Sequence, residues 1–421
     1  MATCWVWYDK SGMTRFVKAK IIIFATLKNE VKIAMEDKIK AKAFIPLIGI
    51  TCATFIFNTS EFVPIGLLTS ISKDFSINEA KAGMLISVYA WVVMLLSLPL
   101  MLMVSRINLR KLLLGVMALF AVFQVMSFLS AGYGMLMFSR IGVACAHSVF
   151  WSVVSPIAVR IAPEKYRSLA LSMVVTGTSV AMIFGLPLGR MIGLWIGWRA
   201  TFLSIGIFAF AALAYLWRFL PDVPSRGGFK VAQLPELLKN KVLMYMFVLT
   251  LAFATAYYTG YSYIEPFLSQ VAGMHNDLVT ATLMFFGAAG ILGSALFSKF
   301  YDANRKRFSD LSLIGLALCL FLLYPLSFNM ASVIVLCIVW GMAVTAYNVA
   351  MQSEIINHTS ARATAVAMSI FSGIFNLGIG SGALIGGAVC SHLSVSYIGF
   401  AGGLLALATL ALWFTKMRRQ L

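Results

Sequence analysis

The chain has 421 residues, of which 61% are apolar and only 11% are charged, and its net charge is +18. A water-soluble domain carries about 25% charged residues, so this composition excludes one and points to lipid as the solvent. The basic residues lie in short clusters between apolar runs rather than on one patch, which argues against nucleic acid as a partner.

Apolar runs of roughly 18–25 residues follow one another along the chain. Each is long enough, at ~1.5 Å rise per residue, to cross a ~30 Å hydrocarbon core. Because backbone amides in lipid must be satisfied within the segment, and because the runs show no in/out alternation, they predict helices and an all-α membrane protein. The twelve expected spans are 43–69, 83–104, 111–131, 134–159, 168–192, 199–219, 242–268, 278–299, 309–328, 331–355, 363–388 and 394–415.

The connections between these spans differ in charge, and short cytoplasmic loops retain Lys and Arg. One alternate set of connections holds most of the basic residues, including Arg110 and Lys111 after the second span. The opposite set holds only Lys73, Lys81, Arg190 and Arg199. We therefore expect a multi-pass protein with both termini in the cytoplasm.

The longest connection follows the sixth span and divides the chain into two bundles of six helices. An internal repeat supports this division, because Arg167, Ala170, Met173 and Gly185 recur 195 residues later as Arg362, Ala365, Met368 and Gly380. The expected parts are a cytoplasmic segment at 1–42, a bundle at 43–219, a cytoplasmic linker at 220–241, a second bundle at 242–415 and a cytoplasmic tail at 416–421.

Residues 1–34 fit this plan poorly. Their apolar stretch IIIFATL is too short for a span or a usual signal segment. We expect a cytoplasmic extension, with Met35 as an alternative start of translation.

Few ionisable side chains lie inside the spans, where a charge costs several kcal/mol unless it is paired or faces water. Glu61 lies in the outer part of the first span, three residues after Asn58, and Pro64 loosens the backbone there. Arg140 lies in the fourth span, with His147 on the same helical stripe. Because the first and fourth spans run in opposite directions, Glu61 and Arg140 are expected at similar depth, as an ion pair that protonation would break.

These residues are the candidates for proton coupling, because a carboxylate that is neutral when buried and charged when wet is a natural proton carrier. Each also has a structural interpretation. Glu61 and Arg140 are alternatively a static pair that fixes helix packing, and His147 a satisfied interior histidine. Glu265, near the outer end of the seventh span, is a further coupling candidate or simply meets lipid headgroups.

Aromatic and amide side chains inside the spans suit a polyhydroxylated neutral ligand, since hydroxyls need donors and acceptors while sugar C–H faces stack on rings. A lipophilic cation would instead favour several acidic residues. Aromatics at span ends usually form interface belts, which is the other interpretation of this set and of Trp91 and Tyr263. The substrate-binding candidates are Asn58, Tyr89, Trp151, Tyr258, Tyr261, Asn348, Gln352 and Asn376.

Glycines are concentrated in the fifth and eleventh spans, where small residues let helices approach closely and a proline permits a bend. The fifth span contains Gly185, Pro187 and Gly189, and the eleventh contains six glycines from Gly373 to Gly387. This pattern indicates either tight static packing or a hinge and sliding surface between the bundles.

Five of the six cysteines lie inside or at the edges of spans, and none of them forms a CxxC spacing. We expect no metal site and no cofactor. A nucleotide-binding GxxxxGK[ST] loop is also missing from the sequence, which argues against an enzyme and against ATP as the driving force.

Several stretches, in order along the chain, resemble one family: FIFNTSEFVPIGLL, YAWVVMLLSLPLML, SRIGVACAHSVFW, GLPLGR, GWRATF, YSYIEPF and FSGIFNLGIGSGALIG. From about residue 43 to 414 the chain resembles the drug/proton antiporter branch of the major facilitator superfamily and, within it, the bacterial sugar efflux transporters. The resemblance implies a bacterial inner-membrane protein that exports pentoses, galactosides or related sugars in exchange for protons.

The resemblance also assigns roles to individual residues. Gly185, Pro187 and Gly189 match the helix-5 motif associated with antiport, and Arg140 matches the helix-4 arginine. The loop motif after the second helix survives mainly as Arg110-Lys111, which leaves its gating contacts in doubt.

We therefore expect a monomeric carrier in the lipid bilayer whose partners are a small sugar and protons. Sugar binds from the cytoplasm between the bundles, Glu61 takes a proton when the cavity opens outward, and Arg140 holds Glu61 ionised between events. The alternatives are a multidrug or other metabolite/proton antiporter of the same fold, and an importer or uniporter.

Overall fold

The computed structural model describes residues 44–104, 107–224, 239–359 and 364–418. The expected segment at 1–42, with the alternative start at Met35, lies outside them, as does most of the linker. The described ranges are helical and contain no strand, so the expected all-α membrane fold is confirmed.

The first half of the chain begins with a long helix at Phe44–Gly66. It continues with α2 (Leu68–Asp74), α3 (Glu79–Val104), α4 (Leu109–Phe128), α5 (Tyr133–Ile161), a short 3-10 turn (Glu164–Tyr166), α6 (Arg167–Val180), a π-helical turn (Ala181–Gly185), α7 (Leu186–Trp195) and α8 (Trp198–Phe219).

The second half has the same order of long helices, with short turns between them. It contains α10 (Lys241–Tyr261), α11 (Ile264–Pro266), a π-helical turn (Phe267–Val271), α12 (Asn276–Phe300), α13 (Arg305–Leu322), α14 (Met330–Asn357), α15 (Thr364–His392), a 3-10 turn (Val395–Tyr397), α16 (Ile398–Leu412) and a final π-helical turn (Trp413–Met417).

Eleven helical segments within the described ranges are long and apolar enough to cross a membrane. The remaining expected span, 309–328, is the ninth along the chain and corresponds to α13, which packs beside α14 and α16 but starts and ends earlier than expected. Its first turns carry three basic residues and Asp310. Asp310 accepts hydrogen bonds from Trp413 Nε1 (2.6 Å) and Arg418 Nε (3.0 Å), so its charge is paired.

Asparagine side chains fix where several of these helices begin. An Asn at the N-cap accepts hydrogen bonds from the free N–H groups of the first turn, which would otherwise be unsatisfied. The residues that cap α4, α10, α13 and α14 in this way are Asn108, Asn240, Asn304 and Asn329.

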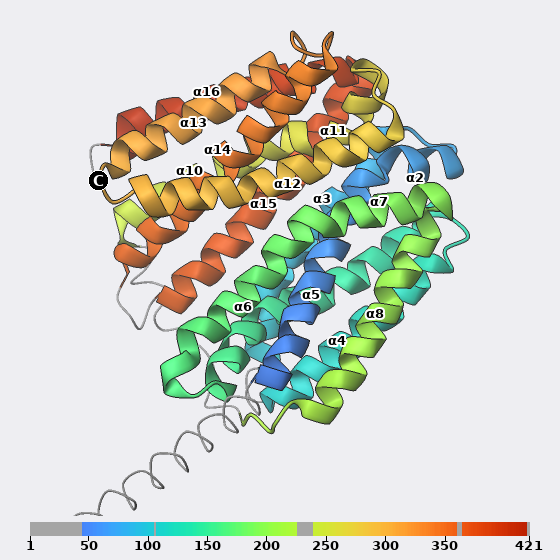
Figure 1. Cartoon of the computed structure of the whole chain (residues 1–421), viewed down its shortest axis with the longest axis vertical. Helices are drawn as coiled ribbons and strands as arrows, with labels where there is room; N and C mark the ends of the chain where they lie inside the picture. Colours follow the sequence, from blue (N-terminus) through green and yellow to red (C-terminus); the bar gives the residue numbers. More distant parts are fainter. Residues whose placement is uncertain (1–43, 105–106, 225–238, 360–363, 419–421) are drawn as a thin grey trace, which may run out of the picture.

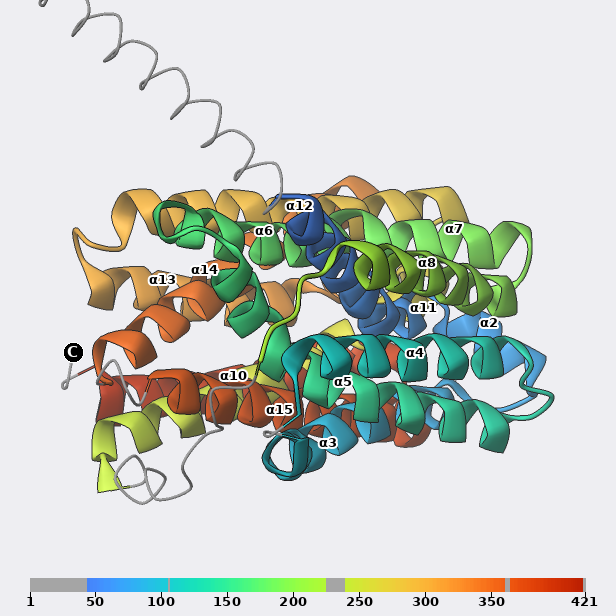
Figure 2. The ribbon, with the colours of Figure 1, turned by 90° about the horizontal axis from the view of Figure 1, so that it is seen from below.

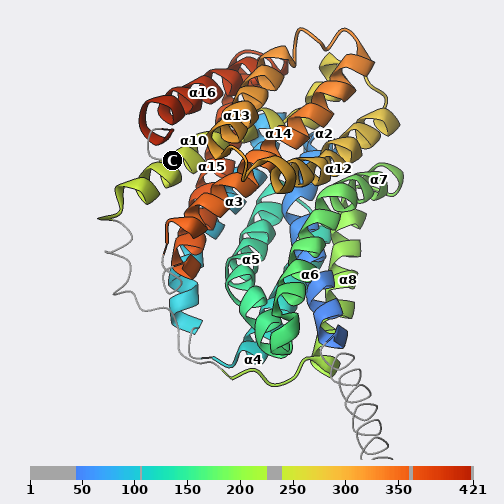
Figure 3. The same cartoon turned by 60° about the vertical axis from the view of Figure 1, so that its left-hand side comes forward.

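The two halves lie beside each other as separate bundles, the first coloured blue to green and the second yellow to red (Figure 1). They meet along two seams: α3 packs against α15, and the segment from α6 to α7 packs against α12. Both pairs are side by side in Figures 2 and 3. Short α2 and α11 contact each other near one end of the molecule, which we call the α2 end.

Glycines in α15 serve both the interior of its own half and the seam with the other half. A Cβ atom at Gly378 or Gly382 would collide with α10 of the same half. A Cβ at Gly380 would instead lie 2.4 Å from the Trp91 indole of α3. The glycines therefore permit close approach of the two halves along α3 and α15.

Two glycines of the helix-5 motif, Gly185 and Gly189, face the first helix of the same half. Cβ atoms at Gly185 and Gly189 would lie 2.1 Å from Thr59 Oγ1 and 2.2 Å from Val63 Cγ2, both in the first helix of the same half. In this structure both glycines permit close packing within the first half. The π-helical turn just before Pro187 presents its other face to α12 of the second half. There a Cβ at Gly287 would lie 2.3 Å from the Met182 carbonyl oxygen.

Candidate functional site

Three helices of the first half bring a carboxylate, an imidazole and a phenol together. Glu61 Oε2, on the first helix, lies 3.7 Å from Nε2 of His147 on α5. The Nδ1 atom of that ring lies 2.8 Å from the hydroxyl of Tyr89 on α3. The Glu61 side chain is 11% exposed and that of His147 is 2% exposed. If the Tyr89 hydroxyl donates to Nδ1, the ring proton is on Nε2 and faces Glu61.

Arg140, also on α5, is buried beside this group but does not form the expected direct ion pair with Glu61. Its Nη1 donates to the carbonyl oxygen of Ser60 (2.9 Å) and to Ser60 Oγ (3.2 Å). Its guanidinium carbon lies 4.3 Å from the centre of the Tyr89 ring, a cation–π contact. The reason lies in Pro64, which has no N–H for the carbonyl four residues earlier. That carbonyl belongs to Ser60 and is free to accept from Arg140.

Gln124 of α4 completes this polar core and was missed by sequence reasoning. It is fully buried, and its Nε2 donates to Ser60 Oγ. An amide in the middle of the apolar run FAVFQVM was the available signal, because a buried amide needs a partner. Ser60 thus connects the first helix to both α4 and α5.

Glu265 does not face lipid headgroups. It is buried at the α2 end, where its Oε1 lies 3.0 Å from Nη2 of Arg190 in α7 of the other half. Both side chains are at most 5% exposed. Thr69 donates its hydroxyl (2.7 Å) and its backbone N–H (3.3 Å) to Glu265 Oε2. This buried ion pair therefore joins the two halves.

Arg190 was expected in a connection, but it has further partners in α12. Its Nη1 donates to the Asn276 carbonyl and to Thr280 Oγ1, both at 3.1 Å, and its Nη2 donates to Asn276 Oδ1 at 3.2 Å. A guanidinium with donors aimed at several acceptors holds a fixed position. Arg190 therefore ties α7 to both α11 and α12.

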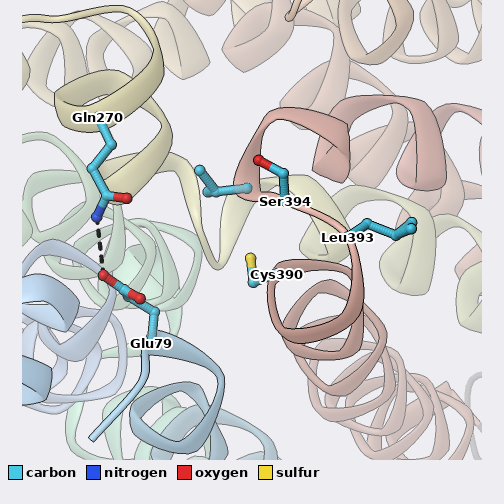
Figure 4. A pocket seen from close by; sticks show the side chains of 6 residues that line it. Glu79, Gln270, Cys390, Leu393 and Ser394 are labelled. Carbon is cyan, nitrogen blue, oxygen red and sulfur yellow. Dashed lines mark hydrogen bonds between the residues drawn. The ribbon is translucent and has the colours of Figure 1, made fainter.

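A third contact between the halves lies at the rim of this end, where Gln270 Nε2 donates to Glu79 Oε1 at 2.9 Å. Beside it is a cavity of about 240 Å³ (Figure 4). The lining residues are Glu79, Gln270, Cys390, Leu393, Ser394 and Val395.

The substrate-binding candidates of the first half fall into two groups. Tyr89 and Trp151 surround His147, with the Trp151 ring centre 6.0 Å from that of the imidazole. Asn58 is buried and bonds locally, donating its Nδ2 to the Thr54 carbonyl (3.0 Å) and to Thr178 Oγ1 (3.3 Å). Through its bond to Thr178, Asn58 links the first helix to α6.

The candidates of the second half are dispersed. Tyr258 of α10 lies beside Phe62 of the first helix, which belongs to the other half, with ring centres 6.4 Å apart. Tyr261 lies within its own half, in an aromatic cluster with Phe286 and Trp340.

The amide candidates lie on α14 and α15. Gln352 donates to Asn348 Oδ1 within α14. Asn376 donates its Nδ2 to the Ser372 carbonyl at 3.0 Å, and its buried Oδ1 has no partner among the described residues.

The remaining motif residues lie at the end opposite to α2. Arg110 Nη2 donates to the Trp217 carbonyl of α8 (2.7 Å), so it holds two helices of the same half together. Lys111 is exposed. Within the described ranges, no group of three or more His, Cys, Asp or Glu side chains is placed to hold a metal ion.

Comparison with known proteins gives one family match. The family model described as Major Facilitator Superfamily matches residues 50–369. The fold is similar to solved structures of a bacterial homolog to the human lysosomal transporter Spinster. Its inward-facing, unoccupied form has a TM-score of 0.69 at 17% identity and covers 90% of this chain and 92% of that chain. Its inward-facing, occupied form has a TM-score of 0.70 at 17% identity, covering 87% and 95%.

The human organic anion transporter MFSD10 (TETRAN) is also similar in structure. Its TM-score is 0.65 at 11% identity, and the match covers 89% of this chain and 99% of that chain. At these identities the likeness concerns the fold alone.

Proposed function

This chain belongs to the Major Facilitator Superfamily and is therefore a multi-pass secondary transporter, and we propose that it exports sugars from the cytoplasm in exchange for protons. It acts as a monomer in a bacterial inner membrane with both termini in the cytoplasm. The α2 end then faces outward.

Contacts between the two halves support uptake of the substrate from the cytoplasm. The Arg190 and Glu265 ion pair and the hydrogen bond between Gln270 and Glu79 close the α2 end. Farther from the α2 end, a Cβ at Gly373 of α15 would have no atom of the described chain within 4 Å. A carrier closed outside and looser inside takes up its substrate from the cytoplasm.

The observation that carries the proton coupling is the position of Glu61. It is a nearly buried carboxylate in a membrane-spanning helix, with the His147 imidazole 3.7 Å away. Such a group changes charge when its access changes from one side to the other. Glu61 takes a proton when the carrier opens outward and releases it in the cytoplasm. Arg140 and Tyr89 hold the surrounding side chains in place.

Polar and aromatic side chains of both halves support a neutral polyhydroxylated substrate. Trp151 offers an aromatic ring beside His147, while Asn376 offers an acceptor with no partner among the described residues. Asn348 and Gln352 offer further donors and acceptors on α14. Pentoses and galactosides present hydroxyls and C–H faces that match such groups.

One observation favours a second candidate, a multidrug/proton antiporter. The Phe62 ring next to Glu61 stacks against Tyr258 of the other half. A carboxylate beside two aromatic rings also suits a lipophilic cation. In that case the cation and the proton would compete for Glu61.

Efflux from proteoliposomes distinguishes these functions. Vesicles are loaded with radiolabelled arabinose, and efflux is measured with and without an inward-directed proton gradient, in the presence or absence of a lipophilic cationic dye. Gradient-stimulated arabinose efflux that the dye does not inhibit supports the sugar antiporter. Dye transport without arabinose flux contradicts it and supports the multidrug carrier.

A further inference from the structure

The seam between α3 and α15 changes character along its length. The glycines Gly387, Gly380 and Gly373 recur every seven residues and therefore lie on one face of α15. A Cβ at Gly387 would be 3.5 Å from the Cα of Ala80, and a Cβ at Gly380 would be 2.9 Å from the Ser87 carbonyl. A Cβ at Gly373 would meet no atom of the described chain within 4 Å. These approaches make the seam close from Gly387 to Gly380 and leave space at Gly373.

Polar atoms with no partner gather at the boundary between the tight and the open part. Trp91 Nε1 lies 2.4 Å from the position of a Cβ at Gly380, and Asn376 lies one helical turn from that glycine, toward the open part. Trp91 Nε1 and Asn376 Oδ1 are both buried without a hydrogen-bond partner in the described part of the chain. Ser87 Oγ, one turn before Trp91 on α3, is likewise buried without a hydrogen-bond partner among the described residues.

Buried polar atoms are nearly always hydrogen-bonded, so unpaired atoms on the two helices of one seam mark a place where a hydrogen-bonding ligand could bind. The two boundary atoms are complementary in kind. An indole N–H can only donate and an amide oxygen can only accept. A hydroxyl group does both at once, whereas a protonated amine cannot accept from Trp91 and an ether cannot donate to Asn376.

We propose that Trp91 and Asn376 form a hydroxyl-binding clasp, in which the Trp91 N–H donates to one hydroxyl of the transported sugar and that hydroxyl donates to Asn376 Oδ1. The clasp rests on the proposed sugar transport and adds Trp91, which is not among the predicted site residues. Because Trp91 belongs to the first half and Asn376 to the second, one hydroxyl bridges both. Its binding therefore favours closure of the seam.

Deoxy sugars test the clasp. Binding of arabinose and of its monodeoxy analogues is measured on the purified full chain in nanodiscs, for the wild type, Trp91→Phe and Asn376→Leu. Trp217→Phe, at a residue that is 67% exposed, is the matched control. A lost hydrogen bond of ordinary strength lowers affinity about tenfold. The clasp makes two such bonds to one hydroxyl, so we expect the wild type and the control to disfavour one particular analogue by about 100-fold, and each seam variant, which keeps one of the bonds, to disfavour the same analogue by only about tenfold.

The possible outcomes separate the two proposals. Arabinose binding by the wild type, with discrimination unchanged in Trp91→Phe and Asn376→Leu, overturns the clasp and leaves sugar transport standing. Loss of discrimination against different analogues in the two variants also overturns it. No arabinose binding by the wild type overturns both proposals. Thermal melting shows whether each variant folds. If one of them does not fold, the other variant is sufficient to test the clasp.

Discussion

Replacing Glu265 by Gln should open the α2 end of the carrier. The substitution keeps the size of the side chain and removes its charge. Arg190 then remains a buried cation with no anion beside it. Arg190 is 1% exposed and lies 3.0 Å from Glu265 in the closed state. In an open state its guanidinium would gain access to water. The substitution therefore penalises the closed state specifically.

The size of the effect follows from the burial of this pair. Breaking a buried ion pair by removing one partner costs about 3–5 kcal/mol. Arg190 retains its bonds to Asn276 and Thr280, so we take the lower value, about 3 kcal/mol. Since 1.4 kcal/mol corresponds to a factor of ten, the ratio of open to closed molecules should rise about 100-fold.

Electron paramagnetic resonance distances report this shift. Spin labels at Trp195 and Leu393, which are 75% and 70% exposed, would mark the two halves in a variant whose native cysteines are replaced by serine. Glu265→Gln should add a population with a longer distance. The matched control is Asp74→Asn, which breaks a pair with Arg199 at 2.7 Å within one half. That pair is 32–40% exposed, and such pairs contribute only about 0–1 kcal/mol.

A distance distribution in Glu265→Gln that matches the wild type would refute the assignment of this pair as the outer closure. An equal change in Asp74→Asn would refute it as well, because the effect would then not depend on burial.

The remaining packing predictions concern glycines. Gly380→Ala places a methyl group 2.4 Å from the Trp91 indole, so we expect about 1–3 kcal/mol of strain across the seam and slower transport in the flux assay. Gly373→Ala is its matched control and should transport like the wild type, because nothing in the described chain lies within 4 Å. Gly185→Ala should lower the melting temperature, and Thr59→Ala should restore it in the double variant, since the added methyl would lie 2.1 Å from Thr59 Oγ1. Failure of that rescue would contradict packing between the first and fifth spans.

The helices were predictable because lipid imposes a length and a composition on each span. The expected span 278–299 is α12 at Asn276–Phe300, and 331–355 is α14 at Met330–Asn357. Bounds differ where a cap or a charge decides them. Asn304 starts α13 four residues before the expected span, because its side chain satisfies the N–H of Arg307.

Partners between helices were harder to predict, because hydropathy does not say which faces meet. Arg190 was assigned to an outer connection although it lies two residues inside the end of the expected span 168–192, where a charge requires a partner. That signal was available, but Glu265 comes from the other half of the chain. Likewise, Arg140 and Glu61 were correctly placed near one another in depth, but Pro64 redirects Arg140 to the free carbonyl of Ser60.

The glycines show the same limit. Their abundance predicted close helix contacts, and these are present. Sequence alone did not separate Gly185, which packs within one half, from Gly380, which packs across the seam.

The most direct test of proton coupling is flux through Glu61→Gln in proteoliposomes. Two quantities are measured for arabinose: stimulation of efflux by an inward-directed proton gradient, and counterflow without a gradient. The control is Asp302→Asn, which neutralises a carboxylate that is 90% exposed. We expect Glu61→Gln to lose the stimulation while retaining counterflow, and the control to behave like the wild type. Stimulation of Glu61→Gln equal to that of the wild type would contradict the role of Glu61 as the proton carrier.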